Sequence, residues 1–316
     1  MARMRTAAIV SFGGPEVLRP MDLPSPSAGP DEVVIRVVAA GVNPVDAQIR
    51  CGALAGRREH RFPLVLGREA AGVVEEVGSG VARLRVGDRV WTYHRPRVEQ
   101  RGTYAECVAV AESEVSRMPS GLLYEEAAAV PCSGLTAWQA LHEHGGVLSG
   151  STVVVLGAAG GVGHLAVQLA AEAGARIVAV AAARDHAFVA SLGAQHTVDP
   201  AADDPGAAIR RLCPQGADLI VDTTGDRRFD GAIAWLAPGG RLVGPAGRTP
   251  STDALGRSVV AFGPRAELSH LDALAERIAR GRVRVHVERM WPLADAAAGH
   301  RRLEAGGVRG KLVLTL

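Results

Sequence analysis

The stretch from Val153 to Gly174 constrains the fold of this chain more than any other. It opens with the apolar, mostly β-branched run Val153–Leu156, which predicts a short buried strand. Three glycines follow at three-residue spacing, and apolar residues then recur at the helical period until Gly174 predicts the end of a helix. A strand, a glycine turn and a helix in this order form the setting in which such a pattern indicates a dinucleotide-binding turn. The run from Ser151 to Ala171 carries no formal charge and is long enough for a membrane span, but its glycines and the central His164 argue against one.

Each glycine of the G-x-x-G-x-x-G pattern has its own expected role. Gly157 permits the tight turn, Gly160 lets the backbone approach a pyrophosphate, and Gly163 lets the helix pack on the strand. The phosphates would then meet free N–H groups and the positive end of the helix dipole. We therefore predict cofactor contacts along the whole turn, from Gly157, Ala158, Gly160, Gly161, Val162 and Gly163.

Composition limits the classes of function open to the chain. Its 316 residues are enough for two domains with full cores, and 47% apolar with 22% charged residues is ordinary for a globular protein. A net charge of +2 gives no support for nucleic acid or an anionic membrane as a partner. No basic-then-apolar leader opens the sequence, so we expect a cytoplasmic protein.

Cysteine and lysine usage narrows the chemistry further. The four cysteines are scattered without a C-x-x-C pair, which argues against a structural zinc lobe and a disulfide framework. Lys311 is the single lysine among 35 lysines and arginines, so lysine chemistry is restricted to that position. We interpret this bias, together with the high alanine content, as a coding effect.

Two kinds of periodicity divide the chain. To about Pro119 it is β-rich, with glycine and proline turns between short strands, which predicts a small barrel-like β domain. From Leu122 strands alternate with helices, which predicts parallel βαβ units in a doubly wound Rossmann sheet. We thus predict an α/β fold in which a discontinuous β-barrel domain, 1–124 and 264–316, accompanies a dinucleotide-binding domain, 125–263.

The residues after the second strand of the Rossmann unit bear on the choice of nucleotide. Folds that take NAD usually place an acidic residue there, where its carboxylate binds the ribose 2′-OH. This chain has Ala183 and Arg184 at that place, and the first acid is Asp185. A guanidinium can pair with a 2′-phosphate in a bidentate manner, so we predict NADP(H) over NAD(H), with contacts from Ala183 and Arg184. The alternative is that Arg184 is simply a solvated residue in an arginine-rich chain.

Motifs in the same order along nearly the whole chain resemble one family, the zinc-independent medium-chain dehydrogenase/reductases of the quinone oxidoreductase branch, similar to zeta-crystallin. The matching segments are 40–46 (AGVNPVD), 67–74 (GREAAGVV), 86–90 (VGDRV), 102–106 (GTYAE), 134–137 (GLTA), 157–163 (GAAGGVG) and 310–312 (GKL). The resemblance implies a GroES-like β domain, a Rossmann domain, a cleft between them that holds NADPH, and a homodimer.

The resemblance also allows the zinc-ligand positions of zinc-dependent relatives to be compared with this sequence, one residue at a time. In zinc-dependent relatives, the first motif carries a cysteine ligand and a Gly-His-Glu segment supplies a histidine. This chain has Asn43 in the first motif and Arg68 in place of the histidine, and an arginine repels a metal ion. Cys132 falls where a third ligand would lie, but one thiolate does not make a site, so we expect no metal.

Several further residues are site candidates, each beside a structural alternative. Asn43 matches an asparagine that in the family lies beside the nicotinamide; alternatively it bonds its own backbone in a turn. Thr136 is expected at the start of a helix, as a helix cap or as a cofactor ligand. Lys311 lies in a motif that approaches the cofactor in relatives, or is a solvated lysine at a sheet edge. Strand-end positions complete the predicted cofactor site: Thr223, Gly244 and Ala246.

Proton donation and the substrate pocket are less constrained. Tyr93 is the nearest candidate for a hydroxyl proton donor, and the basic loop from His94 to Arg101 is either the edge of the substrate entrance or a solvated surface. Relatives often carry a tyrosine a few residues after the Asn-Pro motif, and the segment 50–54 here has none, so the pocket is expected to differ.

These features predict an NADPH-dependent reductase that transfers hydride to a quinone or an α,β-unsaturated carbonyl, of the quinone oxidoreductase or enoyl reductase type, without zinc. Two alternatives remain: a crystallin-like nucleotide-binding module with little turnover, and a zinc-dependent alcohol dehydrogenase.

Overall fold

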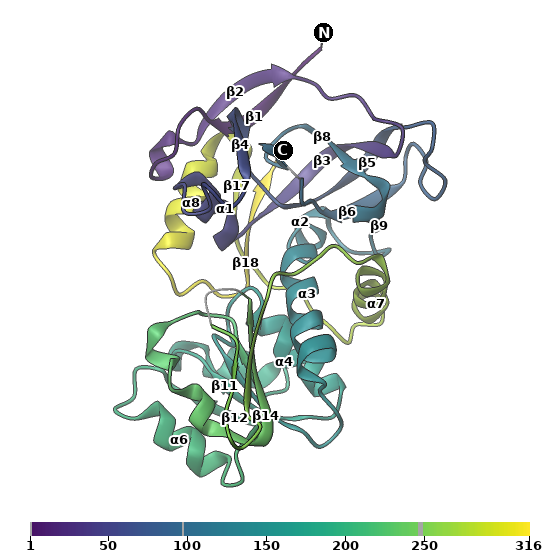
Figure 1. Cartoon of the computed structure of the whole chain (residues 1–316). Coiled ribbons are helices and arrows are strands. Elements are labelled where there is room, and N and C mark those ends of the chain that lie inside the picture. The colour runs from purple at the N-terminus through teal and green to yellow at the C-terminus, as the bar shows by residue number, and fades with distance from the viewer. Residues whose placement is uncertain (1, 97, 246–248) are drawn as a thin grey trace. The chain divides into compact units, whose positions relative to one another are not determined.

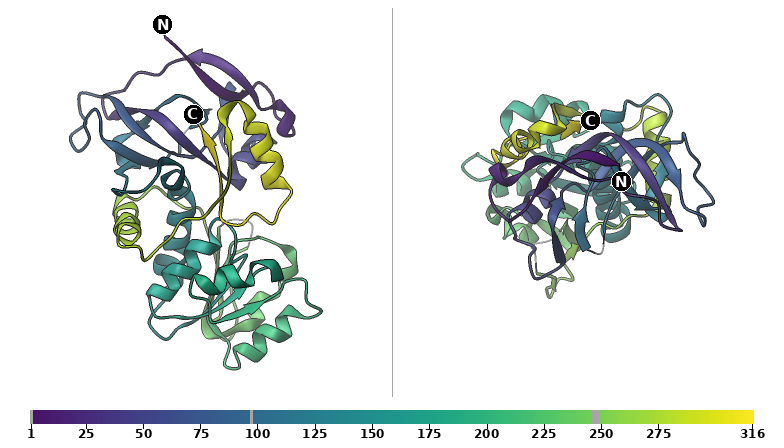
Figure 2. Two further views of the ribbon diagram at one scale, coloured as in Figure 1. Left: turned by 180° about the vertical axis from the view of Figure 1, so that it is seen from behind. Right: turned by 90° about the horizontal axis from the view of Figure 1, so that it is seen from above.

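The computed structural model describes residues 2–96, 98–245 and 249–316, which form two compact units. Unit 1 comprises Met1–Cys132, Arg265–Arg280 and Val285–Leu316, and unit 2 comprises Ser133–Pro264 and Gly281–Arg284. Unit 1 is therefore discontinuous in sequence, and the two ends of the chain lie in it, as Figure 2 shows. Within the described residues, no helix combines the length and the apolar character needed to cross a membrane.

Two sheets build unit 1. The smaller runs in the order β2-β1-β4-β7, and the larger runs in the order β17-β18-β3-β5-β6-β9, with β8 also paired to β3. The strands of the smaller sheet are β1 (Arg3–Ile9), β2 (Arg19–Pro24), β4 (Glu59–Val65) and β7 (Val98–Arg101). Those of the larger are β3 (Glu32–Val42), β5 (Glu69–Val77), β6 (Arg89–Tyr93), β8 (Cys107–Ala111), β9 (Val115–Arg117), β17 (Val287–Pro292) and β18 (Lys311–Thr315).

The sequence predicted a barrel for this unit, and that part of the prediction is wrong. In the described residues the strands form two open sheets, because β4 pairs with β1 and β7 while the long β3 pairs with β5, β8 and β18. β3 is buried along most of its length, so its apolar side chains pack on both faces. Figure 2 shows β18, in yellow, beside the purple β3.

Short helices complete unit 1. They are α1 (Pro44–Arg50), α2 (Tyr124–Ala127), α7 (Leu268–Ala279), α8 (Ala296–Glu304) and the single 3-10 turns η1 (Pro15–Val17), η2 (Glu112–Glu114) and η7 (Leu293–Asp295). Leu312 and Leu314 of β18 and Ala296 of α8 join Ile35 and Leu64 in one apolar core. The downstream segments therefore pack into the core that the first strands begin.

A single sheet organises unit 2. Its order is β12-β11-β10-β13-β14-β16-β15, in which every neighbouring pair is parallel except β15 with β16. Its strands are β10 (Thr152–Leu156), β11 (Arg176–Val180), β12 (His196–Val198), β13 (Ala217–Asp222), β14 (Leu236–Pro245), β15 (Ser251–Thr252) and β16 (Ser258–Phe262). The order of the six parallel strands is that of a dinucleotide-binding Rossmann fold, which confirms the predicted doubly wound sheet.

Helices cover both faces of this sheet. They are α4 (Gly163–Glu172), α5 (His186–Ser191), α6 (Pro205–Leu212) and the 3-10 turns η4 (Ala183–Asp185), η5 (Arg227–Phe229) and η6 (Ala232–Trp235). Val154 and Leu156 pack against Ile209 of α6 and Trp235, on one face. Because successive strand residues point to opposite faces, Val153 and Val155 point to the other, and Figure 1 shows α4 and α6 on opposite sides of the sheet.

The helix that was expected to start at Thr136 begins elsewhere. α3 (Pro131–Trp138) begins earlier and is followed by a π-helical segment, η3 (Gln139–Gly145). Proline is favoured in the first helical turn, where its missing N–H has no intrahelical partner to lose. Thr136 therefore lies inside α3 and not at its start, so the predicted role as a helix cap is wrong.

Candidate active site

Asn43 lies where β3 ends and α1 begins. Pro44 occupies the first turn of α1, and the Asn43 N–H donates to Asp46 Oδ2 at 2.9 Å. Its side chain does not fold back on its own backbone: the amide nitrogen donates to Glu69 Oε1 at 2.8 Å, and the amide oxygen accepts from Lys311 Nζ at 2.6 Å. The Asn43 amide is therefore bound on both sides and is 2% exposed.

Glu69 is fully buried at the start of β5, directly across from Gly41 of β3. Besides the Asn43 bond, its Oε2 accepts from the backbone N–H of Cys132 at 2.7 Å. A Cβ on Gly41 would lie 2.2 Å from Glu69 Oε1 and 2.5 Å from the Ala128 carbonyl oxygen. Glycine at position 41 is thus what makes room for this carboxylate.

Lys311 opens β18 and inserts its ammonium between Asn43 and Glu69. Nζ lies 2.6 Å from Glu69 Oε1 and 2.6 Å from Asn43 Oδ1, with the Val42 carbonyl oxygen at 3.4 Å. Its side chain is 3% exposed, so the alternative of a solvated edge lysine is wrong. A lysine ammonium only donates, which orients the amide unambiguously: Asn43 Oδ1 faces Lys311 and Nδ2 faces Glu69.

A second buried chain of polar groups starts at Asp46. The Tyr104 hydroxyl donates to Asp46 Oδ2 at 3.2 Å and also lies 3.3 Å from His300 Nε2. Arg50 Nη1 lies 2.9 Å from His300 Nδ1, and a second guanidinium nitrogen pairs with Glu304. Since Arg50 only donates, the His300 tautomer has its hydrogen on Nε2 and donates to Tyr104.

Burial controls the protonation of Asp46 and His300 in this row of polar groups. Burial raises the pKa of Asp46 to about 7, against the lowering effect of the Asn43 N–H. Burial lowers the pKa of His300 to about 3, and the neighbouring Arg50 charge adds to this shift. His300 is therefore neutral at physiological pH, while Asp46 changes its protonation close to it.

Tyr93 and Cys132 are held in their neutral forms near Glu69. Tyr93 ends β6, where its backbone pairs with Glu69, and burial raises the pKa of its phenol. Burial and the Glu69 charge raise the pKa of the Cys132 thiol to about 12. Cys132 is thus a thiol and Tyr93 a neutral phenol near neutral pH.

The glycine turn belongs to unit 2, and Gly157 and Gly163 have the geometry that the sequence predicted. Gly157 has a φ of 75°, which favours glycine, and its N–H and that of Ala158 both donate to the Val180 carbonyl oxygen, at 3.1 and 3.0 Å. A Cβ on Gly163 would lie 2.1 Å from the Gly157 carbonyl oxygen. The first turn of α4 therefore packs directly on the glycine turn, and its His164 and Ala166 N–H groups donate to the Gly160 and Val162 carbonyl oxygens, both at 2.9 Å. Cofactor contacts by Gly160, Gly161 and Val162 stay predictions.

Two further predicted residues flank this turn. The Thr223 hydroxyl, just beyond β13, donates to the Leu156 carbonyl oxygen at 2.7 Å, so it ties β13 to the end of β10. Arg184 and Ala183 lie in η4, directly after β11. The Arg184 side chain is 65% exposed, and its Nε lies 3.7 Å from the buried Asp185 carboxylate. An exposed guanidinium at the end of the second Rossmann strand is the position expected for a 2′-phosphate partner.

The remaining candidates are placed as follows. Thr136 is buried in unit 2, and Gly244 lies in β14 beside Ala261 of β16. Ala246 lies outside the described residues.

The sequence reasoning did not select Glu69 or Asp46 as site residues. Both lay in segments that carried the family resemblance, and the single lysine of the chain was the available signal that a carboxylate partner exists.

Comparisons with known proteins agree with this architecture. Residues 29–131 match the family model described as "Alcohol dehydrogenase GroES-like domain", and residues 192–314 match "Zinc-binding dehydrogenase". The chain is 32% identical to the NAD(P)H oxidoreductase RTN4IP1, mitochondrial, of Mus musculus, over 91% of this chain and 82% of that one. It is 31% identical to a quinone oxidoreductase of Pseudomonas aeruginosa, over 96% and 97% of the two chains.

Solved structures also resemble this chain over nearly its whole length. An NAD-dependent alcohol dehydrogenase superposes with a TM-score of 0.91 at 34% identity, covering 99% of this chain and all of the other. A mycobacterial protein complexed with NADPH superposes with a TM-score of 0.87 at 31% identity, with coverage of 99% and 100%. The resemblance seen in the sequence is therefore confirmed: this chain is an NAD(P)H-dependent oxidoreductase of the medium-chain dehydrogenase/reductase family, in its quinone oxidoreductase branch.

Proposed function

We propose that this chain transfers a hydride from NADPH to a quinone or an α,β-unsaturated carbonyl, without zinc. The observation that carries the proposal is the buried Lys311–Asn43–Glu69 cluster, in which the Lys311 ammonium lies 2.6 Å from Asn43 Oδ1 and 2.6 Å from Glu69 Oε1. Reduced nicotinamide supplies the hydride when it is bound. The protein's own task is to bind the acceptor oxygen, which becomes negatively charged as the hydride arrives.

Asn43 is the donor that we assign to this oxygen. Its amide nitrogen carries two hydrogens, and one of them goes to Glu69. We assign the second to the acceptor oxygen. Lys311 acts through Asn43: it holds the amide oxygen, which prevents the amide from flipping, and its charge favours a nearby anion. Tyr93 is our candidate for the final proton, because its phenol is protonated at neutral pH and it lies opposite Glu69 in the pairing of β5 with β6.

The same cluster supports a reaction without zinc. A zinc site of three protein ligands needs thiolate, imidazole or carboxylate donors that converge on one cation. Here the Lys311 ammonium already lies against Glu69, the Cys132 thiol is held protonated, and the buried Arg68 occupies the position of a histidine ligand. These donors do not fit a second, divalent cation, so we derive no step through a metal.

The acceptor and the role of Asn43 are tested together. Purified protein is mixed with NADPH and a panel of quinones and enones, and consumption of the reduced cofactor is followed by absorbance. We expect turnover, and a fall in kcat of about 10- to 100-fold in Asn43→Ala, since hydrogen bonds to charged groups contribute about 1.5–3 kcal/mol. Tight NADPH binding without oxidation by any acceptor would favour a nucleotide-binding module instead.

Arg184 carries the proposed preference for NADPH. We expect Arg184→Ala to weaken NADPH binding by tenfold or more and to leave NADH binding nearly unchanged, because only NADPH has a 2′-phosphate for the guanidinium. Calorimetric titration of both cofactors measures this. Equal weakening of NADPH and NADH binding would refute the assignment.

The family resemblance also leads us to expect a homodimer, which sedimentation equilibrium tests.

A further inference from the structure

A pocket in unit 1 outside the Asn43 cluster is lined mainly by arginines. It has a volume of about 600 Å³ and is formed by four short segments that are separate in sequence. Among the described residues its polar lining is Arg57, Arg58, Arg95, Arg265, Ser113 and Glu114. Four cations thus share one concave surface with a single acid, an arrangement that attracts anions.

The acid in this pocket is already occupied by neighbouring groups. Glu114 Oε2 lies 3.0 Å from His94 Nδ1 and accepts from the Arg95 N–H at 3.3 Å. Glu114 therefore fixes the backbone at Arg95, and its charge is shared with His94. Arg58 Nη1 donates to the Pro96 carbonyl oxygen at 3.1 Å, which joins the loop before β4 to the segment after β6. Arg57 is exposed at the end of that loop.

The pocket is joined to the Asn43 cluster through the pairing of β5 with β6. Tyr93, the last residue of β6, lies opposite Glu69, the first residue of β5. The His94 N–H then donates to the Arg68 carbonyl oxygen at 2.6 Å, and Arg95 follows directly. The strand end that bears Tyr93 therefore continues without a break into the wall of the arginine pocket.

We propose that this pocket binds an oxyanion, a carboxylate or a phosphate, carried by the acceptor away from its reacting carbonyl. This inference rests on the proposed function, because it specifies the class of acceptor for the same site. Guanidinium groups form paired hydrogen bonds with both oxyanions, and several arginines on one pocket wall match a group with two or three charged oxygens. The preferred acceptor is thus an acidic enone or quinone and not a neutral one.

A matched pair of acceptors tests the proposal. 3-Benzoylacrylic acid and its methyl ester carry the same enone and differ in one negative charge. We expect the wild-type protein to prefer the acid in kcat/KM. In Arg57→Gln/Arg265→Gln we expect the acid to lose about 10- to 100-fold while the ester changes less than twofold, since each charge-assisted bond is worth about one to two factors of ten.

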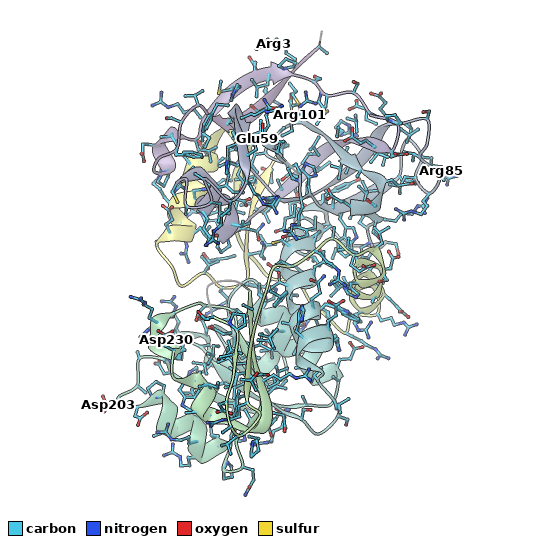
Figure 3. The ribbon with its side chains drawn as sticks, in the orientation of Figure 1. Arg3, Glu59, Arg85, Arg101, Asp203 and Asp230 are labelled. Atoms are coloured by element: carbon cyan, nitrogen blue, oxygen red, sulfur yellow. The ribbon has the colours of Figure 1, made fainter. Side chains whose placement is uncertain are left out.

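The control variant is Arg3→Gln/Arg85→Gln. Both arginines are exposed and labelled in Figure 3, where Arg85 projects from the loop between β5 and β6. This variant has the same net charge as the test variant, and it should leave the ratio of acid to ester unchanged. An equal loss in the two variants would mean long-range electrostatics and would overturn the proposal, as would equal loss of acid and ester in the test variant.

Inhibition distinguishes the two oxyanions and does not depend on turnover of an acidic acceptor. With the methyl ester as acceptor, we expect benzoate or phenyl phosphate to inhibit competitively against the ester and not against NADPH. The stronger inhibitor identifies carboxylate or phosphate, and its inhibition should weaken at least tenfold in Arg57→Gln/Arg265→Gln. Competition with NADPH alone would overturn the proposal. If neither acceptor is reduced, the proposed function fails, and equilibrium dialysis of phenyl phosphate against both variants still tests the pocket.

Discussion

Replacing Lys311 by methionine removes an ammonium from the interior and leaves a buried carboxylate without its cation. Lys311 and Glu69 are 3% and 0% exposed, and their charged atoms lie 2.6 Å apart. Removing one partner of a buried ion pair costs about 3–5 kcal/mol. Glu69 keeps two donors, Asn43 Nδ2 at 2.8 Å and the Cys132 N–H at 2.7 Å, which partly compensate its charge. We therefore expect a loss near the lower limit, about 3 kcal/mol.

The double variant separates charge burial from catalysis. Lys311→Met/Glu69→Gln contains neither charge, so it should be more stable than Lys311→Met alone by about 2 kcal/mol. Its kcat should stay as low as that of Lys311→Met, because no ammonium holds the Asn43 amide oxygen in either variant. The double variant should therefore recover most of the stability that Lys311→Met loses, but none of its lost turnover.

The assay is urea unfolding of the wild type, both single variants and the double variant. Hydrogen exchange of peptides from β3 and β18 shows whether the loss is local to the cluster. The reasoning is refuted if Lys311→Met loses less than about 1 kcal/mol, or if the two single effects add without coupling, since contacting groups must show an interaction energy.

Two further predictions concern protonation and the glycine turn. Asp46 has a pKa raised from 3.8 to about 7, so the fold favours its neutral form, and the stability that is present at low pH is lost progressively as the pH rises from about 4 to about 7. Urea unfolding from pH 4 to 8 should show Asp46→Asn gaining on the wild type by up to about 4 kcal/mol, and a constant difference would contradict this. Gly163→Ala puts a Cβ 2.1 Å from the Gly157 carbonyl oxygen, so the affinity for NADPH in calorimetry should fall at least tenfold. Gly231→Ala, where a Cβ meets nothing within 4 Å, is the matched control and should bind NADPH normally, and an equal effect in both would count against the turn.

Local patterns predicted much of unit 2. The run Val153–Leu156 became β10, and the helical period after Gly163 became α4, because the periods of strands and helices are encoded in neighbouring residues. The parallel order of the sheet then follows from the handedness and length of the crossovers. The same reasoning failed at Thr136, where the start of α3 is set by Pro131 and packing, and the apolar period gave no information on it.

The cluster in unit 1 could not be derived in the same way. Lys311 and Glu69 are 242 positions apart, and they meet only because β18 and β5 both pair with β3. From the sequence, Lys311 could be either a cofactor contact or a solvated lysine at a sheet edge. No local sequence pattern shows whether a single lysine is buried. Gly41 was visible as part of a motif, but its function as space for Glu69 depends on strand register.

The pairing of β18 with β3 has a consequence for the order in which a nascent chain folds. Lys311 and the Val42 carbonyl oxygen are 269 positions apart, and all of unit 2 is synthesised between them. During translation the carboxyl half of β3 therefore keeps one exposed edge while the Rossmann sheet has all its own strands and can form. Because long-range strand pairing is slow and an open edge invites association, we expect β3 to be the segment of the growing polypeptide most dependent on chaperones.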